Sequence, residues 1–218
     1  MATVPMKSEY GPTLGQLLAP RWRAASRCIR MAVIGAALLA VLLAAGLALT
    51  LENARYSRGG RVPFGFEYRG LYRVAPDPGA FVKIDSRDSE GALNYSYEVY
   101  PLTLPPYGTG LWGELPLYSA SYMATLARTL PEFVLIGEGK TKITNTTTGY
   151  DVLYTTEVNG REMYGRNVML FPDERAGVRE GVVVAMLTAE GASAQIKSPS
   201  EVASTGVLLR PLKTFTFG

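Results

Sequence analysis

The longest apolar run of the chain covers residues 31–51 and contains no charged side chain. A helix of that length spans roughly 30 Å at 1.5 Å per residue, which is the thickness of a hydrocarbon core. Ala and Leu dominate the run, and both favour helix. The pattern therefore predicts a single transmembrane helix at residues 31–51, which would make the protein an integral, single-pass component of the cell membrane.

A cleaved signal peptide is the alternative, because residues 45–48 resemble a small-residue cleavage site. Its apolar region is normally about 7–15 residues long, shorter than this one. More arginines lie close before the run than close after it. This difference favours a cytoplasmic N-terminus and a C-terminal domain outside the cytoplasm. The arginines before the run are Arg21, Arg23, Arg27 and Arg30; those after it are Arg55, Arg58 and Arg61.

The rest of the chain divides by composition into a basic cytoplasmic tail at residues 1–30, a polar linker at residues 52–62 and an extracytoplasmic domain at residues 63–218. The prolines of the tail predict that it is disordered. Within the domain, alternating or aromatic segments predict strands. Asn159-Gly160 between two such segments predicts a hairpin, since both turn positions favour positive φ. Residues 181–188 are apolar throughout, which predicts a central strand covered on both faces. The other predicted strand segments are residues 65–74, 80–85, 94–102 and 133–136.

Two helices are expected in this domain. Residues 117–130 carry an apolar stripe between Pro116 and Pro131, which would begin and end the helix. The sequence Ser198-Pro199-Ser200-Glu201 is a capping box with Pro at the first helical position, and predicts a helix running to about residue 209. The expected fold class is α+β: the transmembrane helix followed by an antiparallel sheet flanked by two or more helices.

The order of these elements resembles that of the PsbP-like fold, which includes bacterial extracytoplasmic proteins of the LpqN type. The resemblance covers residues 63–218 and rests on the hairpin around Asn159-Gly160, the apolar strand at 181–188 and the helix at each end. It implies an antiparallel sheet between helices and a binding or assembly role more often than catalysis. No signature motif aligns individual residues, so no functional residue is carried over.

Composition limits the chemistry. The chain has no histidine and a single cysteine, Cys28, which lies outside the domain. Histidine-based acid–base catalysis, Ser-His-Asp triads and the usual zinc sites are thereby excluded. We expect no catalytic residue, no metal and no cofactor. The domain is close to neutral and has no basic cluster of the kind that binds phosphates, so nucleic acid is not an expected partner.

Two further functions remain open. A Ser–Lys hydrolase needs no histidine, although no Ser-x-x-Lys motif is present; its candidates are Ser119, Ser121, Lys83, Lys140, Lys142, Lys197 and Lys213. A fixed accessory subunit of a larger membrane complex is the other, with small residues of the apolar run packing against a membrane-protein partner.

Aromatic residues supply the candidate binding surface. Tyrosine is favoured at interfaces because its ring is apolar and its hydroxyl polar, although aromatic residues also simply populate strands. The candidates are Tyr95, Tyr97, Tyr100, Tyr107 and Trp112. The function expected from the sequence is therefore a non-enzymatic, membrane-anchored domain that binds or helps assemble a partner outside the cytoplasm.

Overall fold

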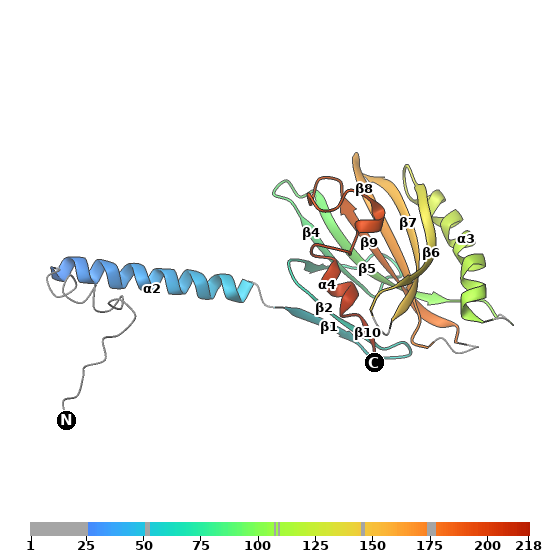
Figure 1. Ribbon diagram of the computed structural model, residues 1–218, viewed down its shortest axis with the longest axis horizontal. Helices are drawn as coiled ribbons and strands as arrows, with labels where there is room; N and C mark the ends of the chain where they lie inside the picture. The colour runs from blue at the N-terminus through green and yellow to red at the C-terminus, as the bar shows by residue number, and fades with distance from the viewer. Residues whose placement is uncertain (1–25, 51–52, 107, 109, 145–146, 174–177) are drawn as a thin grey trace, which may run out of the picture. The chain divides into compact units, whose positions relative to one another are not determined.

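The computed structural model shows two compact units, Met1–Glu52 and Asn53–Gly218. Helix α2 (Arg27–Thr50) belongs to the first unit, and every described strand belongs to the second (Figure 1). The structure describes residues 26–50, 53–106, 108, 110–144, 147–173 and 178–218. The basic tail at residues 1–30 falls mostly outside this described part.

The prediction of a transmembrane helix at residues 31–51 is wrong. Across the described parts of the chain, no helix has both the length and the apolarity needed to cross a membrane. Helix α2 begins before the run and includes Arg27 and Arg30. The fold class built on it is corrected: the described chain has two antiparallel sheets and three α-helices, and all strands lie in the unit Asn53–Gly218.

The larger sheet has seven antiparallel strands in the order β3-β4-β5-β9-β8-β7-β6. Its edge strands are β3 (Tyr72–Val74) and β6 (Val134–Lys142). The strands between them are β4 (Val82–Arg87), β5 (Leu93–Thr103), β9 (Glu180–Ala189), β8 (Arg161–Leu170) and β7 (Thr148–Val158). The longest strands thus lie in the centre, where both faces of the sheet are covered.

The smaller sheet has the order β1-β2-β10. Its strands are β1 (Ala54–Arg58), β2 (Phe64–Tyr68) and β10 (Thr216–Phe217), and the nearby C-terminal helical segments are η1 (Pro199–Glu201) and α4 (Leu209–Lys213). Strand β1 lies in the segment expected to be a linker, where Tyr56 pairs with Phe66 and packs on its ring at 5.4 Å between centroids. Aromatic packing thus makes part of that segment a strand.

Two predictions about strands are confirmed. Strands β7 and β8 pair antiparallel around Asn159 (φ 52°) and Gly160 (φ 79°), the positive-φ pair that this turn requires. Strand β9 pairs with β5 on one side and β8 on the other, and most of its side chains are buried. Its continuous apolar run reflects two covered faces.

Each face of the large sheet has its own hydrophobic core. On one face, Phe66 and Phe215 from the small sheet side pack with Tyr97, Val184 and other sheet residues. On the opposite face, helix α3 (Leu111–Thr129) buries Leu111 and Leu115 against the sheet. Because side chains alternate along a strand, neighbouring residues of β5 and β9 serve opposite cores.

Both helix predictions need correction at their boundaries. Helix α3 begins at Leu111, so Pro116 lies inside it instead of starting it. The capping-box segment forms only the short η1, because Ala203 (φ 59°) and Gly206 (φ 71°) turn the chain away from helix. Glu201 Oε2 accepts a 2.6 Å hydrogen bond from the Lys197 amide, so the side chain of the capping box still reaches back to a backbone donor.

Candidate functional site

A pocket of about 420 Å³ lies between α3 and the sheet face that α3 covers. Helix α3 contacts β6 and β7, and the pocket opens beside it over β5, β9 and β8. Four tyrosines contribute to its wall: Tyr100, Tyr118, Tyr122 and Tyr154. Apolar side chains of α3 and β9 complete much of the lining, including Leu126, Val183 and Leu187. A largely apolar cavity with a few convergent polar groups is the usual form of a small-molecule site.

Local sequence rules place these side chains. Alternation along β5 directs Ser96, Glu98 and Tyr100 toward the pocket face. Tyr118 and Tyr122 are four residues apart on α3, and their rings stack at 6.4 Å with an interplanar angle of 14°. One wall of the pocket is therefore an aromatic pair on the helix, and its floor is a polar strand.

The floor carries a network of charged side chains centred on the buried Glu98. Lys83 Nζ lies 2.7 Å from Glu98 Oε1 and 2.9 Å from Asp77 Oδ2. The hydroxyl of Ser96 donates to Asp85 at 2.9 Å and approaches Glu98 Oε1 at 3.3 Å, and the Tyr100 hydroxyl donates to Glu98 Oε2. Glu98 thus accepts interactions on both carboxylate oxygens while remaining 6% exposed.

A second hydrogen-bond chain crosses the pocket from the sheet to the helix. Tyr154 donates its hydroxyl to Asn167 Oδ1 at 3.2 Å, and Asn167 Nδ2 donates to the Tyr122 hydroxyl at 2.7 Å. Strands β7 and β8 and helix α3 are therefore tied together at this point. The chain holds the tyrosine rings in place before any ligand arrives, which lowers the entropic cost of binding.

The ionisation states follow from burial and partners. Burial opposes the charge of Lys83, but hydrogen bonds to Glu98 and Asp77 together with the attraction of Glu98 and Asp85 outweigh it and raise the pKa of Lys83. Burial raises the pKa of Tyr118, Tyr122 and Tyr154, and burial together with the Glu98 contact raises that of Tyr100. The phenols are therefore neutral and the lysine charged at physiological pH.

The candidate residues from the sequence do not gather on one surface. Tyr100 lines the pocket, whereas Tyr95 and Tyr97 point to the opposite face, where their hydroxyls donate to Ala192 O at 2.8 Å and Pro211 O at 3.3 Å. Trp112 packs beside α3's core, with Lys140 Nζ 4.0 Å from its ring centroid. Tyr107 lies outside the described residues.

Several pocket residues were not proposed as site residues from the sequence, namely Ser96, Tyr118, Tyr122, Tyr154 and Asn167. Two local signals were available. The alternation Ser96-Glu98-Tyr100 places three polar or amphipathic groups on one strand face, and the i,i+4 spacing of Tyr118 and Tyr122 places two rings on one helix face. Tyr154 and Asn167 join them only through strand pairing.

The serines and lysines considered for a Ser–Lys mechanism are also dispersed. Ser119 is fully buried and donates its hydroxyl to Glu138, and Ser121 donates to Tyr118 O at 2.8 Å. Lys83 does lie near a serine, Ser96, but both contact Glu98. A general-base lysine needs a lowered pKa, and the pKa of Lys83 is raised instead.

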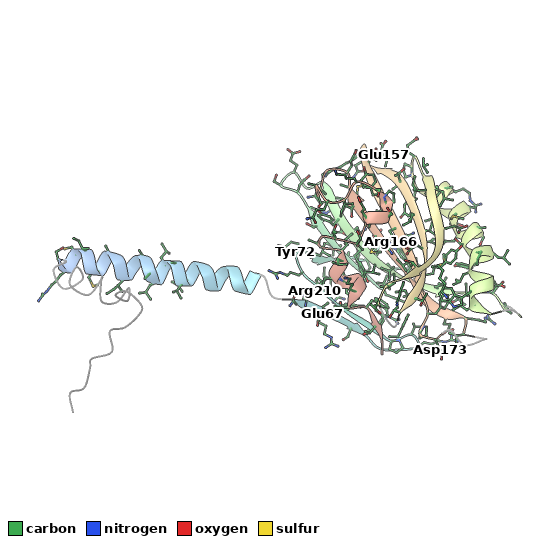
Figure 2. All side chains as sticks on the ribbon, in the orientation of Figure 1. Glu67, Tyr72, Glu157, Arg166, Asp173 and Arg210 are labelled. Carbon is green, nitrogen blue, oxygen red and sulfur yellow. The ribbon has the colours of Figure 1, made fainter. Side chains whose placement is uncertain are left out.

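A separate ion pair is buried on the other sheet face. Arg166 Nη2 lies 2.8 Å from Asp151 Oδ2, and Arg166 Nη1 donates to Val202 O at 3.0 Å. Figure 2 shows Arg166 within the domain, away from the surface pair Glu67 and Arg210, whose closest atoms are 2.6 Å apart. The Asp151–Arg166 pair ties β7 and β8 to the segment after η1 and has a structural role.

No protein-family model matches this sequence, and no curated protein matches it. Among solved structures, the chain is similar to a protein of unknown function from Pseudomonas aeruginosa, with 12% sequence identity and a TM-score of 0.33. The alignment covers 63% of this chain and 83% of that chain. This similarity is too low to carry an argument, and the resemblance to the PsbP-like fold stays a prediction.

Proposed function

We propose that the domain is a non-enzymatic binding domain whose pocket takes an organic monocation, such as a protonated or alkylated amine carried on an apolar group. The observation that carries this proposal is the combination of four tyrosine rings with the buried Glu98 carboxylate in one pocket. Tyrosine faces attract cations through the ring quadrupole, and the attraction strengthens when the site is desolvated.

The charge count of the pocket floor favours a cation over an anion. Among the residues that line the pocket, Asp77 and Glu98 bring two negative charges, and Lys83, which contacts both carboxylates, brings one positive charge. The floor therefore has one uncompensated negative charge, which a singly charged cation would neutralise. An anion would approach Lys83 only by competing with two carboxylates already in contact with it.

The same network supports binding in preference to catalysis. Lys83 is stabilised in its charged form, the phenols in their neutral form, and the Ser96 hydroxyl is occupied by carboxylates. None of these groups is prepared to accept a proton from a nucleophile or to attack a substrate. The interactions instead hold the pocket's shape and charge constant, as recognition requires.

The proposal is tested by calorimetric titration of the full chain with benzyltrimethylammonium and with neopentylbenzene, its uncharged carbon isostere. We expect the cation to bind roughly 10- to 30-fold more tightly, because a desolvated cation–π contact contributes about 2 kcal/mol. Benzenesulfonate, which carries the opposite charge, should not bind. Equal affinity for the cation and its neutral isostere would contradict the proposal.

Replacing Glu98 by glutamine should weaken binding of benzyltrimethylammonium at least tenfold, since the substitution removes the uncompensated charge and keeps the side-chain volume. Glu157→Gln is the matched control, because Glu157 is exposed near the end of β7 and does not line the pocket (Figure 2). Circular dichroism would check that both variants are folded. Tyr118→Leu gives a second variant that removes a ring face and leaves every charge in place.

A further inference from the structure

Apolar side chains gather on the side of α3 and β6 that faces away from the pocket. Within the described part of Asn53–Gly218, five large apolar side chains are exposed, and four of them lie here. They are Leu117 (70% exposed), Val134 (54%), Leu135 (42%) and Ile136 (56%). Exposed apolar residues scattered singly need no explanation, but Val134, Leu135 and Ile136 are consecutive on one edge strand, and such a group marks an interaction surface.

Helix α3 presents a row of apolar, mostly small residues on its outward side. Trp112 and Ser119 contact Lys140 and Glu138 of β6, which identifies the helix side next to β6. At 100° per residue, the adjoining outward side carries a row of exposed residues with no charged or hydroxyl side chain. The row is Gly113, Pro116, Leu117, Ala120, Ala124 and Ala127. Small side chains of this kind allow another helix to approach closely.

Strand β6 ends the large sheet and has one unpaired backbone edge along nine residues. The Ile143 amide donates to Thr147 O at 2.9 Å across the hairpin. Because hydrogen bonding alternates along an antiparallel strand, the backbone groups of Glu138 and Lys140 point away from β7. Unpaired backbone groups of this kind can pair with another strand.

We infer that this surface is the homodimer interface of the protein: β6 pairs antiparallel with β6 of a second copy, and α3 packs beside its counterpart. The inference does not depend on the pocket, because Tyr118 and Tyr122 lie on the other side of α3. Antiparallel pairing across a two-fold axis at Gly139 would place Glu138 of each copy opposite Lys140 of the other. The interface would be isologous, with every contact occurring twice.

Charge complementarity selects a second copy over an unrelated strand. In this register the outward N–H and C=O groups of Glu138 form hydrogen bonds with those of Lys140 in the other copy. The same register places the negative Glu138 side chain beside the positive Lys140 side chain of the other copy. The exposed row on α3 and the residues Val134, Leu135 and Ile136 would be covered by the same two-fold operation. The opposite edge strand, β3, has only three residues and offers no comparable surface.

Sedimentation velocity of the full chain over a dilution series tests this interface by charge reversal. Wild type is expected to sediment as a dimer. Glu138→Lys and Lys140→Glu should each weaken dimerisation at least tenfold, because each places like charges opposite one another. The double variant E138K/K140E should dimerise again, and an equimolar mixture of the two single variants should form a heterodimer. Thermal unfolding checks that each variant is folded.

Cysteine pairing reports the register directly. In a Cys28→Ser background, a mixture of Glu138→Cys and Lys140→Cys chains should form the mixed disulfide in preference to either symmetric one, since hydrogen-bonded pairs place Cα atoms about 5.5 Å apart. A monomeric wild type would overturn the proposal. So would a dimer that both charge reversals leave unchanged, or folded single variants that fail to associate when mixed and give no preferred mixed disulfide.

Discussion

Gly165→Ala is expected to destabilise the domain by roughly 3 kcal/mol and to abolish binding in the pocket, because the new methyl group has no space. A Cβ at this position would lie 2.3 Å from Cε2 and Cζ of the Tyr154 ring. Tyr154 is 3% exposed and bonded to Asn167, so its ring cannot move aside without breaking the hydrogen-bond chain that reaches α3. The pocket thus depends on a glycine that holds no ligand itself.

Urea unfolding measures this effect, with Gly59→Ala as the control, since a Cβ at Gly59 meets nothing within 4 Å. The control should stay within about 0.5 kcal/mol of wild type, as surface substitutions usually do. An alanine at Gly165 that leaves both stability and cation binding unchanged would show that the Tyr154 ring is not held against β8 in solution.

Arg166→Met is expected to cost about 3–5 kcal/mol of stability, because it leaves the Asp151 carboxylate buried without its partner. Asp151→Leu should cost a similar amount by leaving the Arg166 guanidinium unpaired. The double variant D151L/R166M should be more stable than either single variant. Among the residues that the structure describes, Asp151 Oδ1 and Arg166 Nε find no hydrogen-bond partner, so the pair does not fully offset its own desolvation.

The pH dependence of stability gives a second measure of this pair. Burial raises the pKa of Asp151, and the attraction of Arg166 only partly opposes that shift. The folded state therefore binds this proton more tightly than the unfolded state. The resulting contribution to stability is complete below the ordinary aspartate pKa of about 4 and is lost as pH rises through the folded value.

Arg166→Met should raise the pKa of Asp151 further, so that this variant regains stability when the pH is lowered from neutral toward 5. Asp151→Asn should instead remove this part of the pH profile. Unfolding free energies measured at several pH values distinguish these pH profiles from that of wild type. A profile for Arg166→Met that is parallel to wild type would contradict the assignment of a buried, partnered Asp151 carboxylate.

Local sequence signals correctly predicted the β7–β8 turn and the central strand β9. Asn159-Gly160 supplies both positive-φ positions of its turn, and the apolar run of β9 reflects cover on two faces. The start of α3 was missed because Pro116 can begin a helix, yet here the burial of Leu111 and Leu115 extends the helix toward the N-terminus. The prediction of a transmembrane helix at residues 31–51 rested on the length and composition of that run alone, and it is wrong for the described chain.

The pocket could not be read from the sequence because its walls come from five different elements. Tyr100 was among the sequence candidates, but Tyr95 and Tyr97, its near neighbours in the chain, face the other core. Tyr154 and Asn167 reach the site only through the β7–β8 pairing, and the helix tyrosines only through the docking of α3. Long-range packing, which no local motif encodes, brings these groups together.

The most direct test of the proposed binding role is an NMR titration of the full chain, labelled with ¹³C in its tyrosine rings, with benzyltrimethylammonium. We predict saturable shifts of the pocket rings, Tyr100, Tyr118, Tyr122 and Tyr154, and no shift of Tyr72, which is exposed on the edge strand β3. Shifts that are absent, or that move Tyr72 as much as the pocket rings, would contradict a cation site between α3 and the sheet.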